Sequence, residues 1–149
     1  MYHDGNNDPE AQDIWYAEFD DQGKLQEAEN IGKPMNNTYN NSLTSITPDG
    51  QTALLLNAYL PNGEMEAGIS MARKAADGWS RPKPVEMDDY YNQNIYGEYC
   101  LSSSGKVMLL AAQRRDSEGS KDLYVSFRRK NNTWSRPRPL SSNLNTAGS

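Results

Sequence analysis

The chain has 149 residues, a formal net charge of −5 and 36% hydrophobic residues, so it is short and polar. The acidic balance argues against a nucleic-acid partner, and a single cysteine, Cys100, excludes an intrachain disulfide. No stretch suits a signal peptide or a membrane span. Short apolar runs such as 53–56, together with nine Tyr and three Trp, predict a folded, sheet-rich chain. We expect Cys100 to be a buried, inert thiol within a strand.

The first unit that the sequence predicts, residues 1–38, is the second half of a four-stranded sheet. A strand is expected over 13–19, a turn over 20–23 and an outer strand over 25–31. The polar residues 1–12 match the loop that precedes the third strand in the later units. This unit therefore lacks two inner strands.

The second unit, residues 39–91, contains all four strands. A turn at 48–50 combines a proline, which presets φ, with a glycine, which tolerates positive φ. The strand after this turn is a continuous apolar run, which is typical of a strand covered on both faces. Strands are expected at 43–47, 52–59 and 68–73, with an outer strand opening at Trp79.

The third unit, residues 92–149, repeats this plan and adds the start of the next connection. Strands are expected at 99–102, 106–112 and 122–128, with an outer strand opening at Trp134. Prolines follow Trp79 and Trp134, and because proline lacks the ladder N–H, these segments belong at the outer edge of each sheet. We expect Leu55 and Leu109 to be buried in the middle of their sheets.

Independent landmarks recur about 55 residues apart. The segment 79–85 (WSRPKPV) returns as 134–140 (WSRPRPL), and the turn that ends at Gly50 returns at Gly105. A repeat of this length built from short strands indicates β-propeller blades. The sequence thus predicts an all-β fold, a partial β-propeller of four-stranded antiparallel blades, with about two and a half blades in one segment, 1–149.

The same landmarks resemble the WD-like, TolB-type β-propeller repeat, in the version found in OmpA-like cell-envelope proteins of Bacteroidota. The resemblance implies a propeller that serves as an interaction platform in the periplasm, often beside envelope anchoring or secretion machinery. These residues contain no OmpA-like domain, so the resemblance does not bring peptidoglycan binding to them. Gly68, Ser104 and Asn92-Gln93 depart from the pattern. The matching segments are 49–50, 122–124, 134–137, Leu140, Asn145-Thr146 and Asn37-Thr38.

The sequence offers little for catalysis or cofactor binding. His3 is the only histidine and lies in a polar leader, so nucleophilic triads and zinc sites lack their ligands. No phosphate-binding glycine loop is present. The loops 4–8 and 116–122 are rich in oxygen ligands, which leaves a bound cation open as an alternative to a solvated loop. We expect no cofactor, no metal and no catalytic residue.

The loops between blades point to a binding role. In a propeller, the loops that enter each blade lie on the same face as those joining its second and third strands. Tyr, Asn and Arg on that face suit recognition, because they combine large contact area with adaptable hydrogen bonds. Trp79 and Trp134 recur at equivalent places, which favours packing between blades over ligand stacking. The candidate ligand- or partner-binding residues are Asn37, Tyr39, Asn40, Tyr90, Tyr91, Asn92, Tyr96, Arg114 and Arg115.

The sequence therefore indicates a non-catalytic β-propeller module that binds a protein or cell-envelope component in the periplasm. The alternative is a fragment of a propeller-containing hydrolase, active on glycans or peptides, whose catalytic residues lie mostly outside this chain. Expected structural partners are the remaining blades of a longer parent chain, or other copies of this one.

Overall fold

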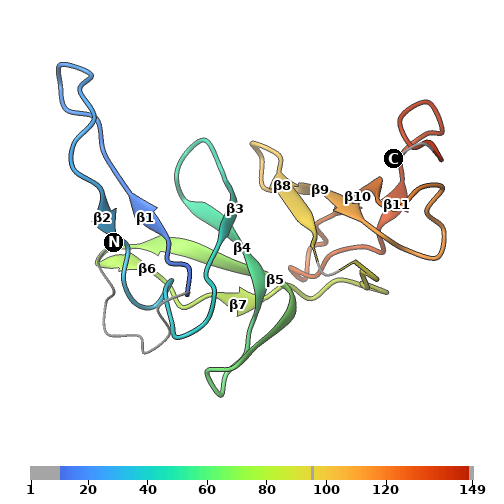
Figure 1. The fold of residues 1–149 in the computed structure, drawn as a ribbon, viewed down its shortest axis with the longest axis horizontal. Coiled ribbons are helices and arrows are strands. Elements are labelled where there is room, and N and C mark those ends of the chain that lie inside the picture. Colours follow the sequence, from blue (N-terminus) through green and yellow to red (C-terminus); the bar gives the residue numbers. More distant parts are fainter. Residues whose placement is uncertain (1–10, 95, 148–149) are drawn as a thin grey trace.

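The computed structural model describes residues 11–94 and 96–147, and every regular element in these ranges is a β-strand (Figure 1). The strands pair antiparallel in three separate sheets. The all-β expectation is confirmed. The described part of the chain contains no helix long and apolar enough to cross a membrane.

The first sheet is a two-stranded ribbon. Strand β1 (Trp15–Tyr16) pairs with β2 (Glu29–Asn30), and Phe19 pairs with Leu25 across the turn at 20–23. The regular strands are much shorter than the expected ranges 13–19 and 25–31. Within the described residues this ribbon has no inner strand beside it, and two-stranded ribbons are weakly held.

The second sheet has a short first strand, two long strands and a divided outer edge. The strand expected at 52–59 has those bounds, whereas the strand expected at 68–73 is longer at both ends. A bulge separates Leu56 from Ala58, where Asn57 takes a φ of 71°. The strands are β3 (Leu43–Ile46), β4 (Thr52–Tyr59), β5 (Met65–Ala75), β6 (Gly78–Trp79) and β7 (Lys83–Pro84), and β6 and β7 both pair with β5.

The third sheet repeats this order with one outer strand. Its three inner strands fall within a residue of their expected positions, whereas the outer strand expected to open at Trp134 begins only at Arg138; the strand order is β11-β10-β9-β8. Pro84 and Pro139 both lie on outer strands, where the missing N–H costs no ladder bond. The strands are β8 (Glu98–Leu101), β9 (Val107–Ala112), β10 (Asp122–Phe127) and β11 (Arg138–Pro139).

The three sheets stack with their faces together, and two apolar cores lie between them. Strands β3 and β8 contact each other, and the Leu101 N–H donates to Ser45 Oγ at 3.1 Å. Leu54 and Leu55 are adjacent in β4 but face opposite ways, one into each core. The first core, between the first and second sheets, holds Ile14, Met35, Ala53, Leu55, Tyr59 and Ala72. The second core, between the second and third sheets, holds Leu54, Ile69, Tyr99, Leu101, Met108, Leu110, Ala112, Tyr124 and Trp134.

Two expectations about burial are wrong, and both concern one face of the third sheet. Leu55 is fully buried, but Leu109 is 44% exposed and Cys100 is exposed. The residue of the third sheet that corresponds to Leu55 is Leu110, which is buried in the second core. Leu109 corresponds to Leu54, and it lies on the side of the third sheet that no further sheet covers within the described residues. We call this side, with Cys100, Leu109, Leu123 and Phe127, the open face.

The two repeated tryptophans pack as the sequence suggested. Trp134 is 1% exposed in the second core, and Trp79 is partly buried against the first. The Trp134 N–H donates to Glu86 O at 2.8 Å, and its carbonyl accepts from Asp88 N–H at 3.1 Å. The chain that leaves the second sheet is thereby fixed to the outer part of the third.

Candidate functional site

The candidate site is built on the connection between the second and third sheets. A cleft of about 240 Å³ opens between this connection and the bulged end of β4 and β5. We call it the connection cleft. It is lined by Leu56, Asn57, Ala67, Gly68, Tyr90, Tyr91, Asn92, Asn94, Gly97 and Tyr99.

Two tyrosines form one wall of the connection cleft. The hydroxyls of Tyr90 and Tyr99 lie 2.6 Å apart, and their rings meet at a tilt of 56°. Burial, and then the neighbouring Tyr99, raises the pKa of Tyr90 well above its usual range, and burial also raises the pKa of Tyr99. Gly97 is needed beside them, because a Cβ there would lie 2.1 Å from the Tyr99 hydroxyl. The pair is therefore neutral and held in one position.

Asn92 organises the loop that borders the connection cleft. Its carboxamide oxygen accepts from Asn94 N–H at 3.0 Å and from Gln113 N–H at 2.8 Å. Its nitrogen donates to Tyr96 O at 3.3 Å. The side chain of Tyr96 is 66% exposed beside this loop. Asn92 thus fixes the backbone, while Tyr96 presents a free aromatic surface.

Arg114 is an internal cation rather than a surface one, since it is only 3% exposed. Its guanidinium lies 4.2 Å from the Tyr91 ring centre and donates to Asp89 O at 2.9 Å. Asp89 and Asp116 each place a carboxylate oxygen 3.4 Å from it. The exposed neighbour, Arg115, donates its backbone N–H to the Tyr91 hydroxyl. Arg114 therefore holds Tyr91 against the third sheet.

The remaining expected residues form a second group, at the entrance to the second sheet. Asn40 Oδ1 accepts from Gln12 N–H, and Asn37 Oδ1 accepts from Tyr39 N–H, each at 2.9 Å. Tyr39 and Asn40 are exposed, whereas Asn37 is partly buried near Met65 Sδ. The structure thus places the expected residues in two groups, each at the start of a sheet.

The position of the repeat asparagine differs by one residue from the sequence prediction. In the structure Asn36, not Asn37, corresponds to Asn145. Asn36 accepts from Ile14 N–H at 2.9 Å and donates to Ile14 O at 3.0 Å. Asn145 makes the same pair of bonds to Leu123, at 2.8 and 3.0 Å. Each asparagine follows its partner by 22 residues, a spacing that is readable in the sequence.

In the loop at 116–122, the carboxylates of Asp116 and Asp122 accept hydrogen bonds from nearby groups of the same chain. Asp122 accepts from the backbone N–H groups of Glu118 and Gly119, and Asp116 accepts from the Tyr124 hydroxyl. Within the described ranges, no three His, Cys, Asp or Glu side chains converge as metal ligands. His3 and the loop 4–8 lie outside the described residues.

Comparison of the chain with protein-family models, with curated proteins and with solved structures finds no match.

Proposed function

We propose that the chain is a segment of a β-propeller that acts as a non-catalytic interaction module and binds a protein or cell-envelope component. Two observations support the propeller. The second and third sheets share one strand order, and their first strands, β3 and β8, lie side by side while the sheets stack through a common core (Figure 1). Radial stacking of antiparallel sheets is the plan of propeller blades.

The connection cleft is the observation that carries the binding role. Its walls combine tyrosine rings with carboxamides, and internal hydrogen bonds hold them in place. Preorganised aromatic and amide groups bind partners with little loss of side-chain entropy. Tyr96, whose carbonyl accepts from the lining residue Asn92, and Arg115, whose N–H donates to the Tyr91 hydroxyl, are exposed contact groups beside the cleft. Tyr39 is an exposed contact group at the entrance to the second sheet.

The periplasmic location rests on the resemblance of the Trp-Ser-Arg-Pro segments to repeats of envelope proteins. The occupant of the connection cleft would then be a protein segment or another component of the envelope. Its apolar surface would contact the tyrosine rings, and its polar groups would contact the amides.

Site-specific photo-crosslinking tests this proposal. A photoreactive phenylalanine analogue replaces Tyr96 in one variant and Phe19, an exposed residue on the first sheet, in the control. Cell-envelope extracts should give a discrete adduct from position 96 and none of that mass from position 19. Identical adducts from both positions would contradict the assignment to the connection cleft.

The identified partner is then titrated against purified variants. We expect Tyr91→Ala to weaken its binding by about tenfold, since Tyr91 lines the cleft and tyrosines rank among the residues on which binding most depends. Lys130→Gln, an exposed change on the third sheet, should leave the affinity unchanged. Turnover of glycoside or peptide substrates by the purified chain would instead favour the hydrolase alternative.

A further inference from the structure

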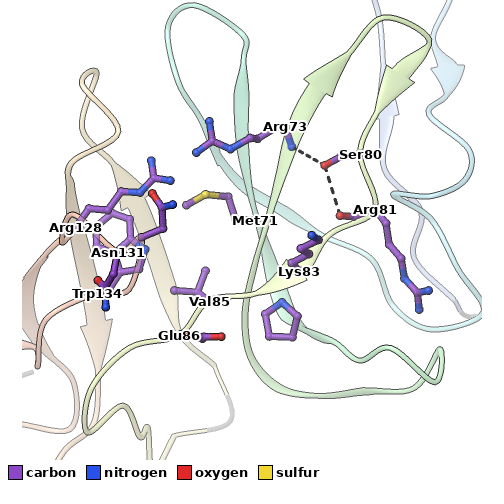
Figure 2. A pocket seen from close by; sticks show the side chains of 12 residues that line it. Met71, Arg73, Ser80, Arg81, Lys83, Val85, Glu86, Arg128, Asn131 and Trp134 are labelled. Carbon is purple, nitrogen blue, oxygen red and sulfur yellow. Dashed lines mark hydrogen bonds between the residues drawn. The ribbon is translucent and has the colours of Figure 1, made fainter.

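A second and larger cavity lies elsewhere on the molecule, in the groove between the second and third sheets. It has a volume of about 550 Å³ and shares no lining residue with the connection cleft. We call it the inter-sheet groove. Its apolar lining includes Met71, Val85 and Trp134, and Asn131 adds a carboxamide (Figure 2).

The charged residues of the inter-sheet groove are mostly basic. Arg73, Arg81, Lys83 and Arg128 line it against one carboxylate, Glu86, although the whole chain carries a net charge of −5. Within the described residues, none of these four cations makes an ion pair. Arg81 turns away from the groove and donates to Leu60 O and Pro61 O. The uncompensated charge is thus contributed chiefly by Arg73, Lys83 and Arg128.

Arg73 and Arg128 approach each other across the groove. Arg73 belongs to β5 and Arg128 directly follows β10, and Figure 2 shows both guanidinium groups directed into the gap above Met71. The Nε of Arg128 is buried and has no hydrogen-bond partner among the described residues. Burial, and then the charge of Arg73, lowers the pKa of Arg128. Two like charges facing each other, one with an unmet donor, are an unfavourable pair that an anion would stabilise.

We propose that the inter-sheet groove binds a ligand through a phosphate or sulfate group held between the guanidinium groups of Arg73 and Arg128. A doubly charged oxyanion matches two facing cations, and the planar guanidinium fork bonds such oxygens in pairs. The groove is larger than the anion alone, and its volume is within the range of small-molecule sites. The apolar surface of Met71, Val85 and Trp134 would contact the remainder of the molecule.

Titration with inorganic phosphate tests the inference on the full chain. Amide and arginine Nε resonances are followed by NMR, with chloride at matched ionic strength as the reference. We expect saturable shifts at Arg73, Arg128 and Trp134. Arg73→Gln and Arg128→Gln should each weaken the apparent affinity by about tenfold, because each removes one charge-assisted contact. Lys130→Gln, an exposed cation outside the groove, should bind phosphate as the parent chain does.

Sulfate titrated in the same way distinguishes the two oxyanions, and saturable binding of either supports the site. If Arg128→Gln does not fold, the test rests on Arg73→Gln, whose side chain is exposed, and on Arg128→Lys, which keeps the charge but loses the fork. Shifts that do not saturate, or an equal loss of affinity in Lys130→Gln, would overturn the inference, because both outcomes describe general charge screening.

Discussion

Single residues in and beside the connection cleft divide into those that fix the backbone and those whose side chains are exposed. The side chains of Asn92 and Arg114 make hydrogen bonds to backbone groups of the chain itself, whereas Tyr96 and Arg115 are exposed. Sequence composition indicates the residue types suited to recognition. It cannot tell which of two adjacent arginines is buried, because that depends on where Tyr91 and Asp89 lie after folding.

The buried tyrosine pair predicts sensitivity to alkaline pH. The hydroxyls of Tyr90 and Tyr99 have pKa values raised above their usual 10.0, chiefly by burial. A raised pKa in the folded state means that the stabilisation is complete below pH 10 and is lost as the pH rises above it. The free energy of unfolding, measured in urea at increasing pH, should therefore fall above pH 10.

The variants Tyr90→Phe and Tyr99→Phe separate this pair from the other tyrosines. Each should show a smaller alkaline loss than the parent chain, whereas Tyr39→Phe, which changes an exposed side chain, should match the parent. An unchanged alkaline slope in both cleft variants would mean that the pair does not titrate with folding.

At the scale of the element, the repeated asparagines predict matched effects on stability. Asn36 and Asn145 are buried, and each closes a pair of hydrogen bonds to a backbone N–H and C=O. Replacing either with alanine leaves those groups unsatisfied and should cost about 1–3 kcal/mol in chemical denaturation. Asn143→Ala, an exposed change two residues from Asn145, is the control and should cost far less. A small effect at one asparagine only would break the proposed equivalence.

The apolar strands give a sharper test, because their leucines differ only in the face they occupy. Leu55→Ala and Leu110→Ala should each cost about 2–5 kcal/mol, since both side chains are buried in a core. Leu109→Ala, on the open face, should change the free energy of unfolding by about 0.5 kcal/mol or less. A large loss at Leu109 would show that another surface covers it in solution.

The positions of the inner strands were predictable from the sequence, and the coverage of their faces was not. Apolar runs and the Gly50 and Gly105 turns are local signals, so the β4 and β9 positions agree closely with expectation. Leu109 and Cys100 are exposed because burial of an outward face requires a neighbouring sheet, which is not a property of the strand itself. The inter-sheet groove was missed for a similar reason, since Arg73 and Arg128 belong to different units and meet only through stacking.

At the scale of the whole molecule, the open face differs from the equivalent side of the second sheet in having no sheet packed against it within the described residues. The corresponding side of the second sheet, with Leu54, Ile69 and Met71, is covered by the third sheet. Leu109 and Leu123 correspond to Leu54 and Ile69 on the third sheet, and they remain exposed together with Phe127. Open apolar faces and unpaired sheet edges favour association. We infer that another unit of the same repeat, from a longer chain or a second copy, would cover this face.

Light scattering and thermal melting of the isolated chain at micromolar concentration test this stacking most directly. The stacking predicts either concentration-dependent association or a low melting temperature. It also predicts that a Leu109→Lys, Phe127→Lys double variant associates less, because both side chains lie on the open face. A monodisperse, thermally robust monomer, unchanged by the double variant, would contradict it and would show that the open face needs no further unit to cover it.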